Sequence, residues 1–218
     1  KICIRIKGGS ITNNIATGNG GGIYCEGDMD IDHGNITGNT ATIGGGIYVT
    51  KGSDTYSDSD ALRITGGNIT GNTATEKGGG VYANHYVVLR GYVNYIKNPY
   101  GLPLCTATVL NNTSGPKGNK KTDNISFAPG QYLNIYNNFK GGNVSLNFTG
   151  AGTKIAIPYG NLTSKLWVND LILSGIHCDD PKYSPVIDKT NNAVLLRSSL
   201  KYLSASDFEF TAPRGFTY

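Results

Sequence analysis

Two short motifs recur three times in this chain, and they constrain its fold more than any other feature. A glycine-rich motif appears as GNGGGIYC at 18–25, TIGGGIYV at 42–49 and EKGGGVYA at 76–83. A second motif precedes each copy, as SITNNIAT from Ser10 and as NITGNTAT from Asn35 and Asn68. Self-similarity with a period of about 20 to 50 residues indicates a repeat fold in which each unit stacks on the next. The sequence therefore predicts a solenoid.

The spacing of the repeat is regular apart from one insertion. Ile11 and Ile36 lie 25 residues apart, and Ile69 follows after 33 residues. The surplus falls in the polar segment 51–60, KGSDTYSDSD. Because an insertion at one place in a repeat maps to a loop on one face of a solenoid, we expect such a loop at 51–60.

Composition favours strands over helices in each unit. Glycine accounts for 31 of the 218 residues and is a poor helix former. Isoleucine and threonine favour strands, and Ile2, Ile4 and Ile6 alternate in KICIRIKG as residues on one strand face do. We predict an all-β chain with three short strands in each repeat (xIxI, GxITxN and GGGIY), stacked about 4.8 Å apart.

Equivalent positions of the three copies should then lie above one another in columns. The columns are isoleucine (Ile11, Ile36, Ile69), alanine (Ala16, Ala41, Ala74) and asparagine (Asn14, Asn39, Asn72). A stacked asparagine amide can bond to its copies above and below and to turn backbone. We therefore expect the asparagines to form a structural ladder.

These motifs resemble the polymorphic outer-membrane-protein type of β-helix repeat and, more closely, Gly- and Asn-rich surface proteins of gut Firmicutes. The resemblance is strongest over 1–95. It implies the pectin-lyase-like fold, a right-handed parallel β-helix solenoid, with about eight turns of three short strands over 1–200. It also implies an adhesin-like protein that is secreted by a Gram-positive gut bacterium and stays on the cell surface.

The end of the chain departs from the repeat. The segment from Lys165 to Arg197 resembles the terminal segment of the same surface proteins, and we expect it to cap the solenoid, with Trp167 packed in the core or cap. Residues 201–218 resemble a linker and the start of a following β-sandwich repeat. Because the chain begins within a predicted strand, we expect a monomeric module of a longer, multidomain protein.

The charge and hydropathy of the sequence argue against binding to nucleic acid and against insertion into a membrane. The charged fraction is 16% and the net charge of +4 is spread along the chain, which is not the footprint of a nucleic-acid-binding protein. The densest basic cluster, Lys117, Lys120 and Lys121, is typical of a solvated loop. No segment is apolar over the length that spans a bilayer, so we expect no membrane insertion here.

One acidic cluster is a candidate for chemistry. Asp28, Asp30 and Asp32 alternate in DMDID, and the period of a strand places all three on its outward face. The alternatives are a calcium site, catalytic acids, or a charge ladder. The repeat spacing sets Arg5 and Arg63 beside Asp30 and Lys7 beside Asp32, and opposite charges on stacked strands pair. We favour the ladder, because neighbouring arginines oppose the raised pKa of a catalytic acid.

No further signature of catalysis or cofactor binding is present. The polysaccharide hydrolases of this fold carry NTD, GHG and RIK motifs. NTD and GHG do not occur in the sequence, and RIK occurs only at 5–7, without the other two. His33, His85 and His177 occur in unrelated contexts and are expected at the surface or in turns, as are Asp179 and Asp180 beside a proline. We predict a protein that is not an enzyme and needs no cofactor, with a polysaccharide-active lyase or hydrolase as the alternative.

The four cysteines form no CxxC pair, which argues against a zinc or redox site. They are Cys3, Cys25, Cys105 and Cys178. The repeat spacing places Cys3 above Asp28, three residues after Cys25. The sequence leaves two alternatives open: a disulfide between Cys3 and Cys25, or buried free thiols.

The tyrosines of the glycine motif provide a candidate binding surface. Tyr24, Tyr48 and Tyr82 each follow an inward aliphatic residue, so they should point outward as a ladder. Exposed aromatic rings bind sugars or anchor protein partners, whereas a closed stack would only cover the wall. A second ladder, Thr12, Thr37 and Thr70, could order water, although the glycine-rich spacing argues against this role. We predict a surface module that binds a host or matrix glycan or protein.

Overall fold

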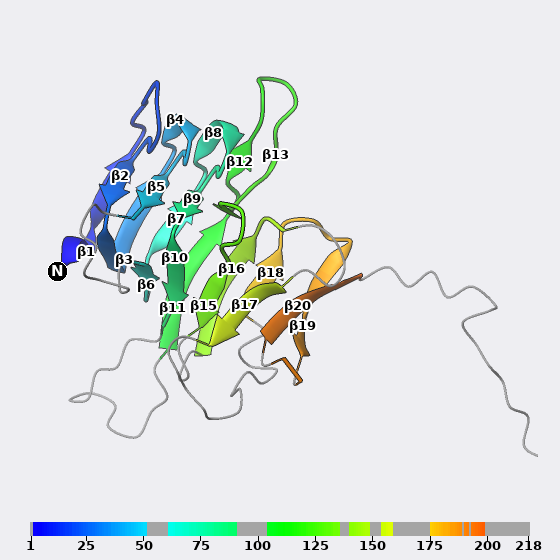
Figure 1. Ribbon diagram of the computed structural model, residues 1–218. Helices are drawn as coiled ribbons and strands as arrows, with labels where there is room; N and C mark the ends of the chain where they lie inside the picture. The colour runs from blue at the N-terminus through cyan, green and yellow to red at the C-terminus, as the bar shows by residue number, and fades with distance from the viewer. Residues whose placement is uncertain are drawn as a thin grey trace, which may run out of the picture.

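The computed structural model describes residues 2–51, 61–90, 104–135, 140–148, 154–158, 175–188, 190–191 and 193–198. Within them the protein consists of strands and connections and has no helix, which confirms the all-β prediction (Figure 1). Trp167, the segment 201–218 and all of the predicted loop 51–60 except Lys51 lie outside the described residues, as does the Cys3 side chain.

Most described strands pair in parallel, in three sheets. The large sheet comprises β1 (Ile2–Thr12), β3 (Asp28–Thr37), β6 (Ala61–Ile64), β7 (Asn68–Thr70), β10 (Tyr86–Leu89), β11 (Leu104–Leu110), β15 (Leu133–Ile135), β16 (Lys140–Leu146), β17 (Lys154–Pro158), β18 (Ile176–Cys178), β19 (Tyr183–Asp188) and β20 (Ala193–Ser198). The second comprises β4 (Thr40–Ile43), β8 (Thr73–Lys77), β12 (Thr113–Ser114) and β13 (Lys121–Thr122). The third comprises β2 (Ile23–Glu26), β5 (Ile47–Thr50), β9 (Val81–Asn84) and β14 (Ile125–Phe127).

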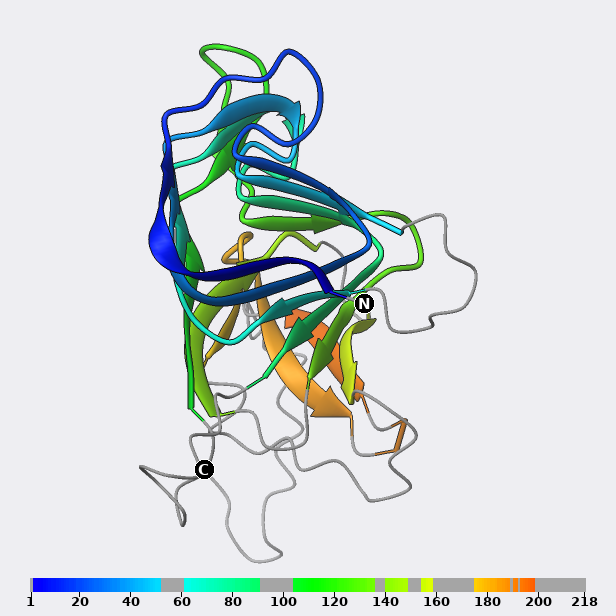
Figure 2. The same cartoon turned by 90° about the vertical axis from the view of Figure 1, so that its left-hand side faces the viewer.

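The large sheet bends around the core and is nearly closed, like a barrel (Figure 2). The long strand β3 makes the bend, since its first half pairs with β6 and its second half with β7. Gly34 lies between these halves with a φ of 114°, and a methyl group here would be 3.1 Å from the Gly9 carbonyl oxygen. The predicted xIxI and GxITxN strands are thus continuous in β1 and β3, and separate as β6 and β7 in the third copy.

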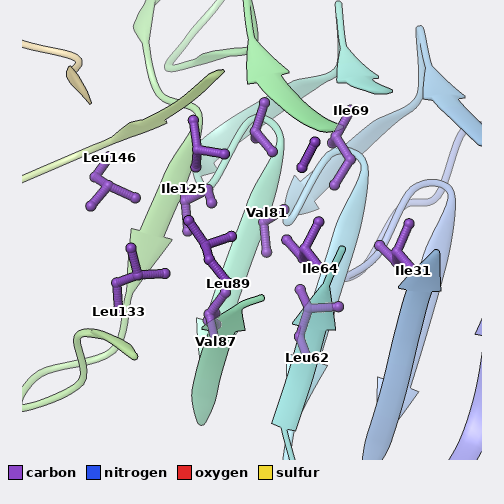
Figure 3. Packing of buried hydrophobic residues seen from close by; sticks show 14 of the residues in the cluster. Ile31, Leu62, Ile64, Ile69, Val81, Val87, Leu89, Ile125, Leu133 and Leu146 are labelled. Carbon is purple, nitrogen blue, oxygen red and sulfur yellow. The ribbon is translucent and has the colours of Figure 1, made fainter. Parts of the chain in front are cut away.

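Aliphatic columns fill the space inside the sheets (Figure 3). One column follows the register Ile6, Ile31, Ile64, Leu89 and Ile135 across five strands of the large sheet. Another column, Ile23, Ile47, Val81 and Ile125, follows the third sheet. Alternate residues of each strand point inward, so short strands with few apolar side chains bury a continuous core only by stacking.

The glycine triplets occur where successive turns of the chain approach one another most closely. A methyl group at Gly45 would lie 2.3 Å from the Thr73 carbonyl oxygen and 2.5 Å from that of Gly79. At Gly46 it would lie 2.6 Å from the Gly80 carbonyl oxygen and 3.0 Å from the Asn72 side chain. Real side chains do not tolerate such contacts, so the triplets allow the turns and the asparagine column to pack together.

Two predicted neighbours of the first strand are wrong by one residue. Lys7 pairs with His33 and not with Asp32, because the register shifts between Ile6 and Lys7. A second shift between Ile2 and Ile4 sets Ile2 beside Asp28, the position predicted for Cys3. Fixed offsets fail here because bulges change the number of residues on one strand relative to its partner.

Candidate functional site

The asparagine column forms a continuous hydrogen-bonded ladder through the interior. The backbone N–H and Nδ2 of Asn14 both donate to Oδ1 of Asn39, at 3.0 and 2.9 Å. Asn39 donates in the same way to Asn72, and Asn72 to Asn112. From Asn39 onward these asparagines are fully buried. All amides therefore point in one direction along the stack.

Each buried rung is satisfied on every side. Nδ2 of Asn39 also donates to the Ile11 carbonyl oxygen at 2.9 Å, and Nδ2 of Asn72 to that of Ile36 at 2.8 Å. An unsatisfied buried amide costs about 1–3 kcal/mol, so this pattern makes each rung depend on the turn above and the turn below. The ladder stabilises the stack and leaves its amides unavailable to a ligand.

The ladder continues beyond the three predicted asparagines and ends at a carboxylate. Asn112 donates to Asn124 through its backbone N–H and Nδ2, both at 2.9 Å. Asn124 donates to Asp179 at 2.7 and 2.6 Å, and the Ser145 hydroxyl donates to the same carboxylate at 2.5 Å. A carboxylate accepts these bonds but has no N–H to pass on, so the run of donors stops at Asp179.

Part of this extension had a signal in the sequence. VLNNTS at 109–114 occupies the register of ITGNTA at 69–74, so Asn112 corresponds to Asn72. Asn111 adopts a φ of 58°, close to the 67° of Gly71, and asparagine is one of the few residues other than glycine that tolerates this region. Asn124 and Asp179 have no such signal, because they lie in segments that do not repeat the motif.

The acidic cluster is brought together with three arginines. Arg5 lies 3.0 Å from Asp30 and 3.4 Å from Asp32. Arg63 bonds Asp30 at 2.5 Å and Asp28 at 3.2 Å. Arg90, which sequence reasoning missed, lies 3.3 Å from Asp30. Each carboxylate of the cluster thus has an arginine partner, as the ladder interpretation requires.

The sequence predicts all three carboxylates on an outward face, but two of them are buried and not exposed to solvent. Asp28 and Asp30 are 4% and 1% exposed, and the guanidinium groups lie against them. Burial alone would lower the pKa of Arg63, but its hydrogen bonds to Asp30 and Asp28 raise that pKa above the ordinary value. Arg63 therefore stays charged, and its ion pairs with Asp28 and Asp30 hold the buried part of the cluster together.

The tyrosines form a ladder whose exposure decreases along the stack. The rings of Tyr24 and Tyr48 stack with centroids 5.2 Å apart, and those of Tyr48 and Tyr82 at 5.5 Å. Tyr24 is 49% exposed and Tyr82 only 7%, with the Lys77 ammonium 4.7 Å from its ring centroid. Stacking covers the ring faces that neighbours share, and Tyr24, at the end of the row, is the most exposed of the three.

The remaining candidates are cysteines and histidines. Burial raises the pKa of both Cys105 and Cys178 to about 11, so these thiols are protonated and weakly nucleophilic at neutral pH. The Cys3–Cys25 pairing stays a prediction. His33 and His177 are exposed, as expected, while His85 is half-buried with its ring 4.4 Å from that of Tyr86.

Metal sites and membrane spans are two further classes of site. In the part of the chain that the structure covers, no group of three His, Cys, Asp or Glu side chains is arranged to hold a metal ion. Nor does this part contain a helix with the length and apolar character needed to cross a bilayer. Comparison with models of protein families, with curated proteins and with solved structures yields no match.

Proposed function

We propose that this chain is a non-catalytic module of a bacterial cell-surface protein, wound as a right-handed parallel β-helix of about eight turns. One lateral face of the stack binds a host or matrix glycan or protein. The module lies outside the cell and acts as an adhesin-like scaffold, in keeping with the resemblance of its motifs to Gly- and Asn-rich surface proteins.

The observation that carries this proposal is the complete pairing of the acidic cluster. Lyases and hydrolases need a carboxylate that binds a metal ion or exchanges a proton. Asp28, Asp30 and Asp32 are each paired with an arginine, and the guanidinium groups lie where a metal ion or a substrate would approach these carboxylates. The cluster supports a scaffold better than a catalytic centre.

The binding role rests on two regular outward rows on the large sheet. Ser10, Asn35 and Asn68 follow one register, and Thr12, Thr37 and Thr70 follow another. Asn35 and Asn68 are exposed, and the Asn68 amide donates to Asn35 Oδ1 at 2.9 Å. Hydroxyl and amide groups at strand spacing can form hydrogen bonds with successive hydroxyls of a polysaccharide or with a protein backbone.

A glycan and matrix-protein array tests the binding role, and two paired variants locate the face. Asn35→Ala with Asn68→Ala should abolish capture of the ligand, whereas Tyr24→Ala with Glu26→Ala should not. The reverse result would mean that the ligand binds at the tyrosine ladder of Tyr24, Tyr48 and Tyr82. No capture on any array would reject the adhesin role. Depolymerisation of pectin, alginate or a glycosaminoglycan, with or without calcium, would reject the non-catalytic role.

A further inference from the structure

One part of the outer side of the large sheet, which we call the neutral face, carries hydroxyl and amide groups. It covers the second half of β3 together with β7, β11 and β16, which are neighbours in this order (Figure 1). Its described outward residues are Asn35, Thr37, Asn68, Thr70, Thr106, Thr108, Leu110 and Asn143. None of these is charged, whereas Arg5, Asp30 and Arg63 lie on another part of the sheet. The register places Lys7 beside His33, before the neutral face begins.

One row of the neutral face continues past the three sequence repeats. Ser10, Asn35 and Asn68 share a register, Thr108 pairs with Asn68, and Asn143 pairs with Thr108. We call these five residues the axial row, because they run along the stack with one polar side chain in each layer. With neighbouring strands about 4.8 Å apart, the axial row is about 19 Å long.

The exposed amides of the axial row have bonding capacity left for a ligand. Asn68 Nδ2 donates to Asn35 Oδ1 at 2.9 Å, and Asn35 Nδ2 lies 3.5 Å from the Ser10 hydroxyl. An amide has two N–H donors and an oxygen with two lone pairs. One bond to each neighbour therefore orients the amides and still leaves each of them able to donate and accept. The buried asparagine ladder has no such capacity.

The composition of the neutral face discriminates between classes of ligand. Protein interfaces depend on aromatic and arginine anchors at their centre, and Leu110 is the only large apolar side chain among the described residues of this face. A polyanion requires cationic partners. The hydroxyl groups of a neutral polysaccharide both donate and accept, and a sugar ring in an extended chain is about as long as the distance between two strands.

We propose that the axial row binds a neutral, linear polysaccharide that runs along the stack, with about one sugar residue in each layer. The side chains of the row form hydrogen bonds with successive sugar residues. Thr37 and Thr70, about 7 Å away along their strands, contact the other edge of the sugar chain. This inference rests on the proposed function and narrows its ligand.

Affinity electrophoresis of the full chain tests the class of ligand. The gels contain mixed-linkage β-glucan, galactomannan or xyloglucan, and alginate or heparin as charged counterparts. At least one neutral polysaccharide should retard the protein, and alginate and heparin should not. Oligosaccharides of the retarding polysaccharide should compete about tenfold better with five sugar residues than with two, because each layer adds hydrogen bonds that are individually weak.

Single variants locate the ligand on the axial row. Thr108→Val and Asn143→Ala each remove one polar group beyond the sequence repeats, and each should weaken binding about threefold. Asn68→Asp keeps the shape of the side chain but replaces two donors by a charge, and should weaken binding about tenfold. Thr122→Val, at an exposed threonine of β13 in the second sheet, is the matched control and should leave binding unchanged. Unchanged urea midpoints confirm that the variants are folded.

The outcomes separate this inference from the adhesin role. Binding of a neutral polysaccharide that Thr108→Val and Asn143→Ala leave unchanged, or full competition by a disaccharide, would overturn the extended row but not the adhesin role. Retardation by alginate or heparin alone, or capture of a protein alone, would overturn the neutral ligand in the same way. Failure of every neutral polysaccharide would also overturn this inference, and the adhesin role fails with it only if the array captures nothing.

Discussion

The three copies within residues 2–90 and the later part from Leu104 build the same stack with different side chains. In the first region, asparagine lies on asparagine and glycine on glycine. In the second region, Asn124 lies next to Gly80 in the stack. The Gly78 N–H donates to the Asp123 carboxylate at 2.7 Å, whereas the equivalent Gly44 N–H in the first region donates to the Lys77 carbonyl oxygen. The difference shows that the stack requires a hydrogen-bond acceptor or donor at each of these positions, and that more than one residue type can provide it.

The largest effect should come from a methyl group between the closely packed turns of the first region. Gly45→Ala places Cβ against two backbone carbonyl oxygens, so we expect a loss of more than about 4 kcal/mol in the free energy of unfolding, or no folded protein. Gly130→Ala in the second region has a φ of 80° but nothing within 4 Å, so it should cost only about 1–2 kcal/mol of backbone strain. Urea denaturation compares them, and equal losses would contradict close packing of the triplets.

The second largest loss of stability should come from removal of the Asp30 carboxylate, which lies at the centre of the acidic cluster. Asp30→Ala leaves Arg63 without its shortest partner in a largely buried network, and we expect a loss of about 3–5 kcal/mol. Asp32→Ala removes one longer contact to Arg5 and should cost less than half as much. Thermal and urea unfolding measure both. A smaller loss for Asp30→Ala than for Asp32→Ala would show that the arginines do not depend on the buried carboxylate.

The interior of the asparagine ladder should be more sensitive than its first rung. Asn72→Ala removes the acceptor for both donors of Asn39 and the Nδ2 group that donates to Asn112 and to the Ile36 carbonyl oxygen, so we expect a loss of about 2–3 kcal/mol. Asn14→Ala lies at the exposed end and should cost less than about 0.5 kcal/mol. Equal losses of stability for the two variants in chemical denaturation would mean that the burial of an asparagine does not determine how much it stabilises the protein.

The carboxylate end of the ladder tests the second region. Asp179→Asn keeps one acceptor oxygen but removes the charge that strengthens the bonds from Asn124 and Ser145, and we expect a loss of about 1–2 kcal/mol. Hydrogen exchange should show faster opening at Asn124 and in β18, with β3 unchanged. Uniformly faster exchange throughout the chain would show instead that the ladder end controls global unfolding.

The smallest effect concerns pH. The pKa of Cys105 is raised to about 11 by burial, against an ordinary 9.0 when unfolded. The folded state therefore holds this proton more tightly, and the stability that it contributes is complete below pH 9 and falls as the pH rises toward 11. Between pH 8 and pH 10 wild type should lose about 1 kcal/mol more than Cys105→Ala. Parallel pH curves for the two proteins would contradict burial of the thiol.

The sequence predicted those features that repeat, because a repeat states which residues lie above one another. The asparagine, isoleucine and tyrosine columns required only the spacing of the motifs, and so did the Arg5, Asp30 and Arg63 contacts. Burial was not predictable in this way. Asp30 was expected on an outward face, but it is buried. One of the arginines that bond it, Arg90, reaches it from 60 residues away.

The remaining failures have the same physical origin. Irregularities in the pairing of β1 with β3 shifted the neighbours of Lys7 and Cys3 by one residue relative to a fixed offset. Asp179 joins the ladder across 55 residues from Asn124, and no local pattern marks it. Long-range contacts outside a repeat depend on the path of the intervening chain, which neither periodicity nor composition encodes.

Solution NMR offers the most direct test of the stacked ladder on which this account rests. Scalar couplings across hydrogen bonds should link the side-chain amide nitrogen of Asn39 to the side-chain carbonyl carbon of Asn72, and that nitrogen of Asn72 to the carbonyl carbon of Asn112. These amide protons should also exchange slowly with water. Absence of both couplings, with rapid exchange of the same protons in the folded protein, would contradict the ladder and the register that it fixes.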